Sequence, residues 1–122
     1  MAARSFSTSP RTKPQRSIHR FTLEEANRAL PLVRRIVSDV VQTHAAAAAA
    51  REAVESAASP KDADALQKTL DAAIGRLEEL VDELAGVGVE MKDLQTGLVD
   101  FVGRHDGRDV YLCWKLGEEQ IA

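Results

Sequence analysis

Mostly hydrophobic residues recur every three or four positions in two separate stretches of the chain. The first series is Leu30, Val33, Val37, Val40, His44, Ala47, Arg51 and Val54. The second series is Leu66, Leu70, Ala73, Leu77, Leu80 and Leu84. This spacing places each series on one face of an α-helix. It predicts two long helices, over residues 31–58 and 60–85, that pack antiparallel as a helical hairpin.

Capping residues and prolines set the expected helix ends. Thr22, with Glu25 three positions later, forms a capping box that begins a helix. Pro31 lacks a backbone N–H and clashes with the preceding turn, so it is expected to limit this first helix to residues 22–29.

The second long helix has its own start and stop signals. Ser59 is expected to cap its N-terminus, and Pro60 fits the first helical turn. Gly86 is expected to provide the left-handed residue that ends it.

The hydrophobic period changes from three-and-four to two near the C-terminus. Two β-rich segments, about 98–102 and 110–115, flank the turn-forming sequence GRHDGRD. A two-stranded hairpin alone is only marginally stable, so it must lie against the helices or pair with another chain. Trp114, the only tryptophan, is the expected anchor. The predicted fold class is mainly α: a long antiparallel helical hairpin, preceded by a short helix, with an appended C-terminal two-stranded β-hairpin.

The hydrophobic stripe is wider than one helix pair can cover. The residues expected to mediate self-association are Ile36, Val40, Val41, His44, Ile74 and Val81. Leaving such side chains in water is unfavourable, because each buried aliphatic side chain contributes roughly 1.5–3 kcal/mol. The pattern therefore predicts a homodimer in which two hairpins form a helical bundle.

Charge separates the chain into a basic N-terminal arm and an acidic domain. Residues 1–20 contain five basic residues and no acidic residue, which leaves 11 basic and 19 acidic residues in 21–122, a net charge of −8. The arm is expected to be disordered, and its composition also resembles a transit peptide. The acidic domain argues against nucleic-acid binding. No apolar run is long enough to cross a membrane. With a single cysteine, the default location is the cytoplasm, or an organelle if residues 1–20 act as a transit peptide.

Candidate chemistry is sparse. The possible soft metal ligands are His19, His44, His105 and Cys113. Their spacing matches no metal-binding motif, and no Gly-rich phosphate loop is present, so we expect no metal and no cofactor. Cys113 shares a strand face with Lys115, which could lower the pKa of the thiol, although a lone strand cysteine is more typical of inert packing.

Carboxylates beside the predicted strands leave one further possibility. Asp100 could form a buried ion pair with Lys92 or Lys115, or could simply face solvent. The candidate ligand- or partner-binding residues are Asp100, Trp114, Lys115 and Glu118. They would form a small-molecule or metal-binding site, possibly an active site, at the junction of the β-hairpin and the helices. Because this reading depends on four scattered side chains, a non-enzymatic assembly module is the leading hypothesis.

Three segments together resemble a known family. The sequences FTLEEANRALPLVRRI, GVEMKDLQTGLVDF and VYLCWKLGE, within residues 21–118, resemble DUF2203, a family of small bacterial proteins without an established biochemical function. The resemblance implies a helical hairpin with an appended β segment and implies no activity. It also implies a further segment after the Gly-Glu pair, with a Trp-His pair and a late arginine. This sequence stops at Ala122, so relative to that pattern it is C-terminally shortened.

Overall fold

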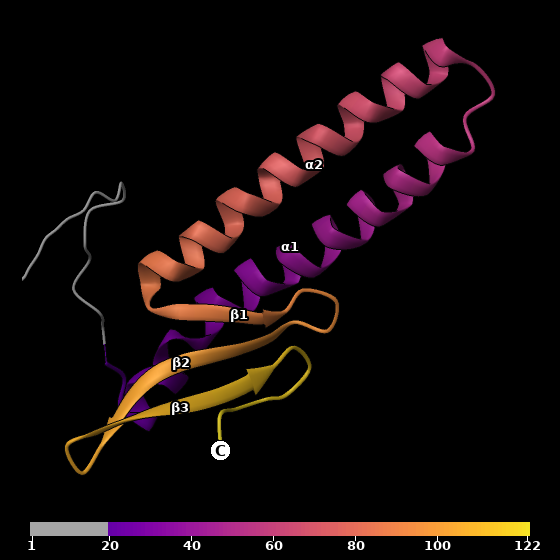
Figure 1. The fold of residues 1–122 in the computed structure, drawn as a ribbon. Helices are drawn as coiled ribbons and strands as arrows, with labels where there is room; N and C mark the ends of the chain where they lie inside the picture. Colours follow the sequence, from indigo (N-terminus) through magenta and orange to yellow (C-terminus); the bar gives the residue numbers. More distant parts are fainter. Residues whose placement is uncertain (1–19) are drawn as a thin grey trace, which may run out of the picture.

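The computed structural model describes residues 20–122, which form a helical hairpin packed against a small sheet (Figure 1). Helix α1 spans Leu23–Glu55 and helix α2 spans Pro60–Val87. Strands β1 (Val89–Asp93), β2 (Leu98–His105) and β3 (Arg108–Lys115) form an antiparallel sheet in the order β1-β2-β3. The mainly α fold and the helical hairpin are confirmed. The predicted disordered arm, apart from residue 20, lies outside the described residues.

The predicted break at Pro31 is wrong, because α1 continues through it. Leu30 and Val33 on either side of the proline are buried in the core, so tertiary packing holds the helix together across it. Pro31 itself is exposed, and its missing N–H leaves only the carbonyl of Asn27 without its usual intrahelical donor. The expected capping box of Thr22 and Glu25 is present, with Glu25 N donating to Thr22 Oγ1 at 3.0 Å.

Helix α2 begins as predicted and ends two residues later than predicted. Ser59 caps it, with Pro60 in the first turn. Its left-handed end is Gly88, at φ 102°, and not Gly86. Helical geometry therefore extends to Val87, which packs against the core.

The sheet has three strands, so the predicted two-stranded hairpin is incomplete. Strand β1 pairs antiparallel with β2, with Val89 opposite Phe101 and Met91 opposite Val99. Its sequence, VEMKD, places only two apolar residues inward and is too short for a clear period-two pattern. Strands β2 and β3 are longer than predicted, because the turn between them contains only Asp106 and Gly107, both left-handed.

The inner face of the sheet packs on the half of the hairpin farthest from the loop between α1 and α2 (Figure 1). Trp114 and Phe101 are fully buried there. Phe21 meets Phe101 edge to face, with ring centroids 5.2 Å apart. This arrangement confirms Trp114 as an anchor of the sheet, because its whole side chain is covered by the chain itself.

The hairpin extends well beyond the sheet (Figure 1). We call this extension, residues 44–74, the distal arm. A cluster of only three buried residues, Ala47, Ala50 and Leu70, occupies it, with Ala73 and Ile74 packed alongside. The main core contains fourteen buried residues. Most of the hydrophobic burial is therefore at one end of the hairpin.

Candidate site at the junction of the sheet and helix α1

Three of the four residues predicted to form a site lie on two different faces of the sheet, and Glu118 lies in the segment after β3. Trp114 points inward, toward α1, and is 0% exposed. Asp100 pairs with Cys113 and Leu98 pairs with Lys115 across β2 and β3, so Asp100 and Lys115 share the outer face. The four side chains therefore do not converge on one pocket.

Asp100 is a buried carboxylate on this outer face, which is opposite the face that packs on α1 and α2. The residue is 8% exposed. Cys113 Sγ donates to Asp100 Oδ1 at 2.9 Å, and Lys92 Nζ lies 3.7 Å from Asp100 Oδ2. The predicted pairing of Asp100 with Lys92 is confirmed, and the alternative of a solvent-facing acid is wrong. The buried carboxylate of Asp100 is stabilised because β3 supplies the Cys113 donor and β1 supplies the Lys92 ammonium.

The same hydrogen bond controls the chemistry of Cys113. The bond to Asp100 raises the pKa of the thiol, and partial desolvation and the nearby carboxylates of Asp100 and Glu118 raise it further, against a smaller opposing effect of Lys92. The suggestion that Lys115 lowers this pKa is wrong. Because the thiolate is the reactive form, the arrangement disfavours nucleophilic catalysis by Cys113.

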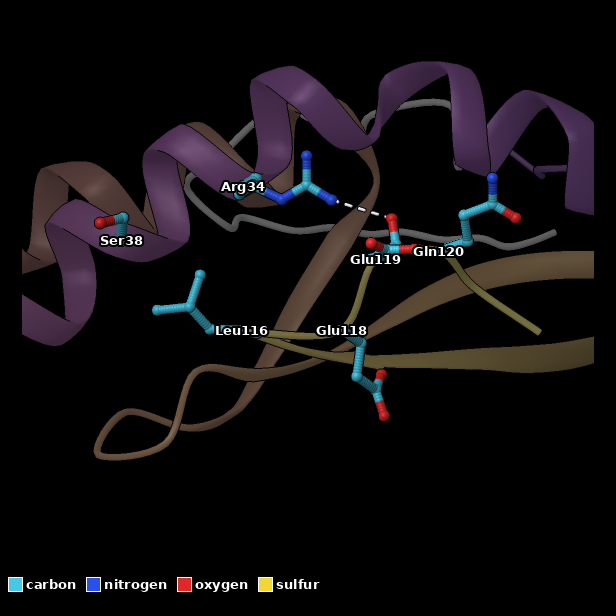
Figure 2. Close-up of a pocket in the computed structure, with 7 residues that line it drawn as sticks. Arg34, Ser38, Leu116, Glu118, Glu119 and Gln120 are labelled. Carbon is cyan, nitrogen blue, oxygen red and sulfur yellow. Dashed lines mark hydrogen bonds between the residues drawn. The ribbon is translucent and has the colours of Figure 1, made fainter.

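The inner side of the junction contains a pocket of about 750 Å³ between α1 and the C-terminal segment, residues 117–122 (Figure 2). The lining residues are Arg34, Ser38, Leu116, Gly117, Glu118, Glu119 and Gln120. The guanidinium of Arg34 lies 5.7 Å from the centre of the Trp114 ring and donates from Nη2 to the Glu119 carbonyl at 2.9 Å. Arg34 therefore supplies positive charge to this pocket.

Glu118 contributes main chain to the pocket, while its carboxylate points away from α1 (Figure 2). That carboxylate accepts from the backbone N–H of Lys115 at 3.0 Å, and Trp114 Nε1 donates to the Glu118 carbonyl at 3.0 Å. Of the predicted residues, Glu118 alone lines this pocket, and Trp114 lies beside it under Arg34.

Asn27 holds the end of the C-terminal segment. Its amide exchanges two hydrogen bonds with the main chain of Ile121, with Ile121 N donating to Oδ1 at 2.8 Å and Nδ2 donating to the Ile121 carbonyl at 3.1 Å. Ile121 is only 3% exposed. The sequence analysis missed Asn27 and Arg34. Their separation of seven places them on one helix face, yet nothing in the sequence indicates that this face binds the last residues.

Two of the six residues predicted to mediate self-association are not available for it. Ile36 and Val40 are 7% and 0% exposed and belong to the main core. The hydrophobic pattern of the helices alone does not reveal this burial, because Ile36 and Val40 belong to a core that α1 forms together with α2 and the sheet. Val41, His44, Ile74 and Val81 remain partly exposed.

The remaining candidates do not form a metal centre within the described part of the chain. Residues 20–122 contain no group of three or more His, Cys, Asp or Glu side chains placed to hold a metal ion. His105 is at the exposed end of β2, and its Nε2 lies 3.3 Å from Asp106 Oδ2. His19 lies outside the described residues. No helix among residues 20–122 is long and apolar enough to cross a membrane.

The fold and site define a small mainly α protein, a helical hairpin closed at one end by an antiparallel sheet and a bound C-terminal segment. Residues 19–122 match the family model DUF2203, described as an uncharacterized conserved protein. The chain belongs to this family, and the resemblance noted in its sequence is confirmed. No curated protein and no solved structure matches it significantly.

Proposed function

We propose that this protein is a non-enzymatic interaction module that self-associates through its helical hairpin. The observation that supports the proposal is the uneven core. The distal arm has three buried residues, two of them alanines, against fourteen at the sheet end. Most helical stability in proteins comes from packing of an apolar face, so an arm with so little burial is marginal alone.

Partly exposed apolar residues extend from the sheet toward the arm. Val81, Leu77 and Leu94 line a hollow of about 270 Å³ together with Glu78 and Asp82. Ile74, two helical turns from Val81, continues the same face of α2.

On α1, Val41 faces the turn between β1 and β2, since a Cβ added to Gly97 would lie 3.1 Å from Val41 Cγ2. This strip of Val41, Ile74, Leu77 and Val81 fits a second hairpin, which would complete a four-helix bundle by covering the strip on both copies.

Hydrogen exchange of the full chain at increasing protein concentration tests this proposal. Amides of residues 44–74 are expected to exchange several-fold more slowly at high than at low concentration, because association stabilises the arm by mass action. Amides of β2, already in the main core, should change little. Val81→Asp should remove the concentration dependence, whereas Leu32→Asp, at an exposed position outside the strip, should retain it. Arm exchange that is the same at all concentrations contradicts the proposal.

A second candidate function is ligand binding in the pocket beside Arg34. The observation that favours it is a guanidinium at the pocket wall that uses one N–H for the Glu119 carbonyl and retains other donors. Such a group suits a carboxylate or phosphate group.

Amide NMR spectra recorded with added acetate or inorganic phosphate test this second function. Shifts confined to residues 34–38 and 116–120 are expected. They should disappear in Arg34→Gln and persist in Arg35→Gln, since Arg35 is exposed on the same helix and does not line the pocket. Shifts that persist in Arg34→Gln, or no shifts at all, would exclude this function.

A further inference from the structure

Strand β3 forms an open edge of the sheet. It is the last strand in the order β1-β2-β3, and its eight residues pair with β2 on one side only. Among residues 20–122, the only other backbone partner of β3 is Glu118, whose N–H donates to the Lys115 carbonyl in the following turn. The outward-facing N–H and C=O groups of Asp109, Tyr111 and Cys113 are therefore available to another strand, whereas both groups of Lys115 are already bonded to Glu118.

The sequence of this edge lacks the features that usually prevent pairing. Exposed edges are commonly protected by central charges, proline or bulges. The five central residues of β3, Val110–Trp114, include no charge and no proline, and the register with β2 is continuous. Tyr111 is 62% exposed on this strand, and Cys113 is also exposed. The charged residues, Arg108, Asp109 and Lys115, lie only at its ends.

We propose that β3 pairs antiparallel with β3 of a second copy, about a two-fold axis at Leu112, to make one continuous six-stranded sheet. In this register Asp109 of each chain lies opposite Lys115 of the other, on the outer face. Val110 lies opposite Trp114 on the inner face, so the helices of both copies are on the same side. Opposite charges that face one another across two strands stabilise the pairing.

The charges of the strand select this register and favour a second copy as the occupant. Registers with the same hydrogen-bond pattern differ by two residues, and they place Lys115 opposite Gly107 or Tyr111, where it has no opposite charge. Asp109 already binds Arg20 through both oxygens, with Oδ1 2.8 Å from Nε and Oδ2 3.1 Å from Nη2, and Arg104 Nη2 lies 3.6 Å from Oδ1, but the Asp109 side chain remains 49% exposed. Its two oxygens can accept further donors. Lys115 is exposed, and its ammonium has no partner among residues 20–122.

This contact is separate from the hairpin contact proposed above. It uses the sheet edge, whereas the hairpin contact uses the strip on the helices. Each contact has its own two-fold axis, so a protein that makes both would form an assembly larger than a dimer. Loss of one contact leaves the other measurable.

Disulfide trapping with Tyr111→Cys tests the proposed register. In this register position 111 lies directly opposite Cys113 of the second copy, the only native cysteine. Within one chain, positions 111 and 113 lie about 7 Å apart along the strand, too far for an internal disulfide. Treatment with diamide, which oxidises two thiols to a disulfide, should therefore link two chains of this variant.

Val102→Cys is the matched control, because Val102 pairs with Tyr111 on the same face of the sheet but lies one strand in from the edge, out of reach of Cys113 of the second copy. The Tyr111→Cys variant should form the covalent dimer about tenfold faster than the control, since paired strands hold the two thiols at a high effective concentration. Equal rates in the two variants, faster linking of the control or of the native chain, or no linked dimer would overturn the proposal. Retained concentration-dependent exchange in the distal arm would show that the hairpin contact survives that failure.

Discussion

Replacing Trp114 with alanine is expected to lower the free energy of unfolding by about 3–5 kcal/mol, the range for a large aromatic side chain removed from a core. The ring is fully buried between the sheet and α1. The substitution also removes the Nε1 donor of the Glu118 carbonyl and the ring that faces Arg34. The loss therefore affects both the core and the attachment of the C-terminal segment.

The size of this effect matters because single domains are in general only marginally stable. Single domains typically unfold with about 5–15 kcal/mol, so this one substitution removes a large share of that stability. Urea denaturation followed by far-UV circular dichroism measures the change. The matched control is Tyr111→Ala on the same strand, studied in dilute protein. Because Tyr111 is 62% exposed, its loss should be within about 0.5 kcal/mol. Similar losses in both variants would contradict the assigned role of Trp114.

Local signals in the sequence predicted most of the helical structure correctly. The three-and-four spacing of residues such as Val33, Val37 and Leu80 indicates which face of each helix is buried. These residues do lie in the main core. Thr22 and Ser59 cap the helices as expected. These features depend on residues close in sequence, so they can be read without the fold.

The errors arose where tertiary packing overrides a local preference. Pro31 is a residue type that usually breaks a helix. Here its neighbours Leu30 and Val33 are buried in the core, and this packing keeps α1 continuous. Strand β1 has too few residues to show a period, and its pairing with β2 stabilises it. Gly86 and Gly88 are both plausible ends of α2, and only the path into β1 distinguishes them.

The candidate site was harder to predict than the fold. The sequence identified Asp100 and Trp114 as unusual, and both are buried. Their places on alternate faces of neighbouring strands follow from the register with β3, which sequence alone does not provide. Arg34 and Asn27 donate hydrogen bonds to main-chain carbonyls more than eighty positions away in the sequence. Every residue has such a carbonyl, so the residue types do not indicate these contacts.

The second large effect that we expect is a rise in the molar mass of the protein in solution as its concentration increases. Four of the predicted contact residues remain partly exposed on the hairpin, and the distal arm has little core of its own. Burial of apolar surface favours association, and stable protein interfaces bury about 1,200–2,000 Å² in total. Two copies that cover one another's hairpins have enough length for such an interface, since α1 is about 50 Å long.

Sedimentation equilibrium of the full chain, from nanomolar to high micromolar concentration, measures this directly. The mass is expected to rise with concentration from one chain to two or more, and in Val81→Asp this rise should shift to higher concentration. A mass of one chain throughout the range would contradict self-association through the hairpin.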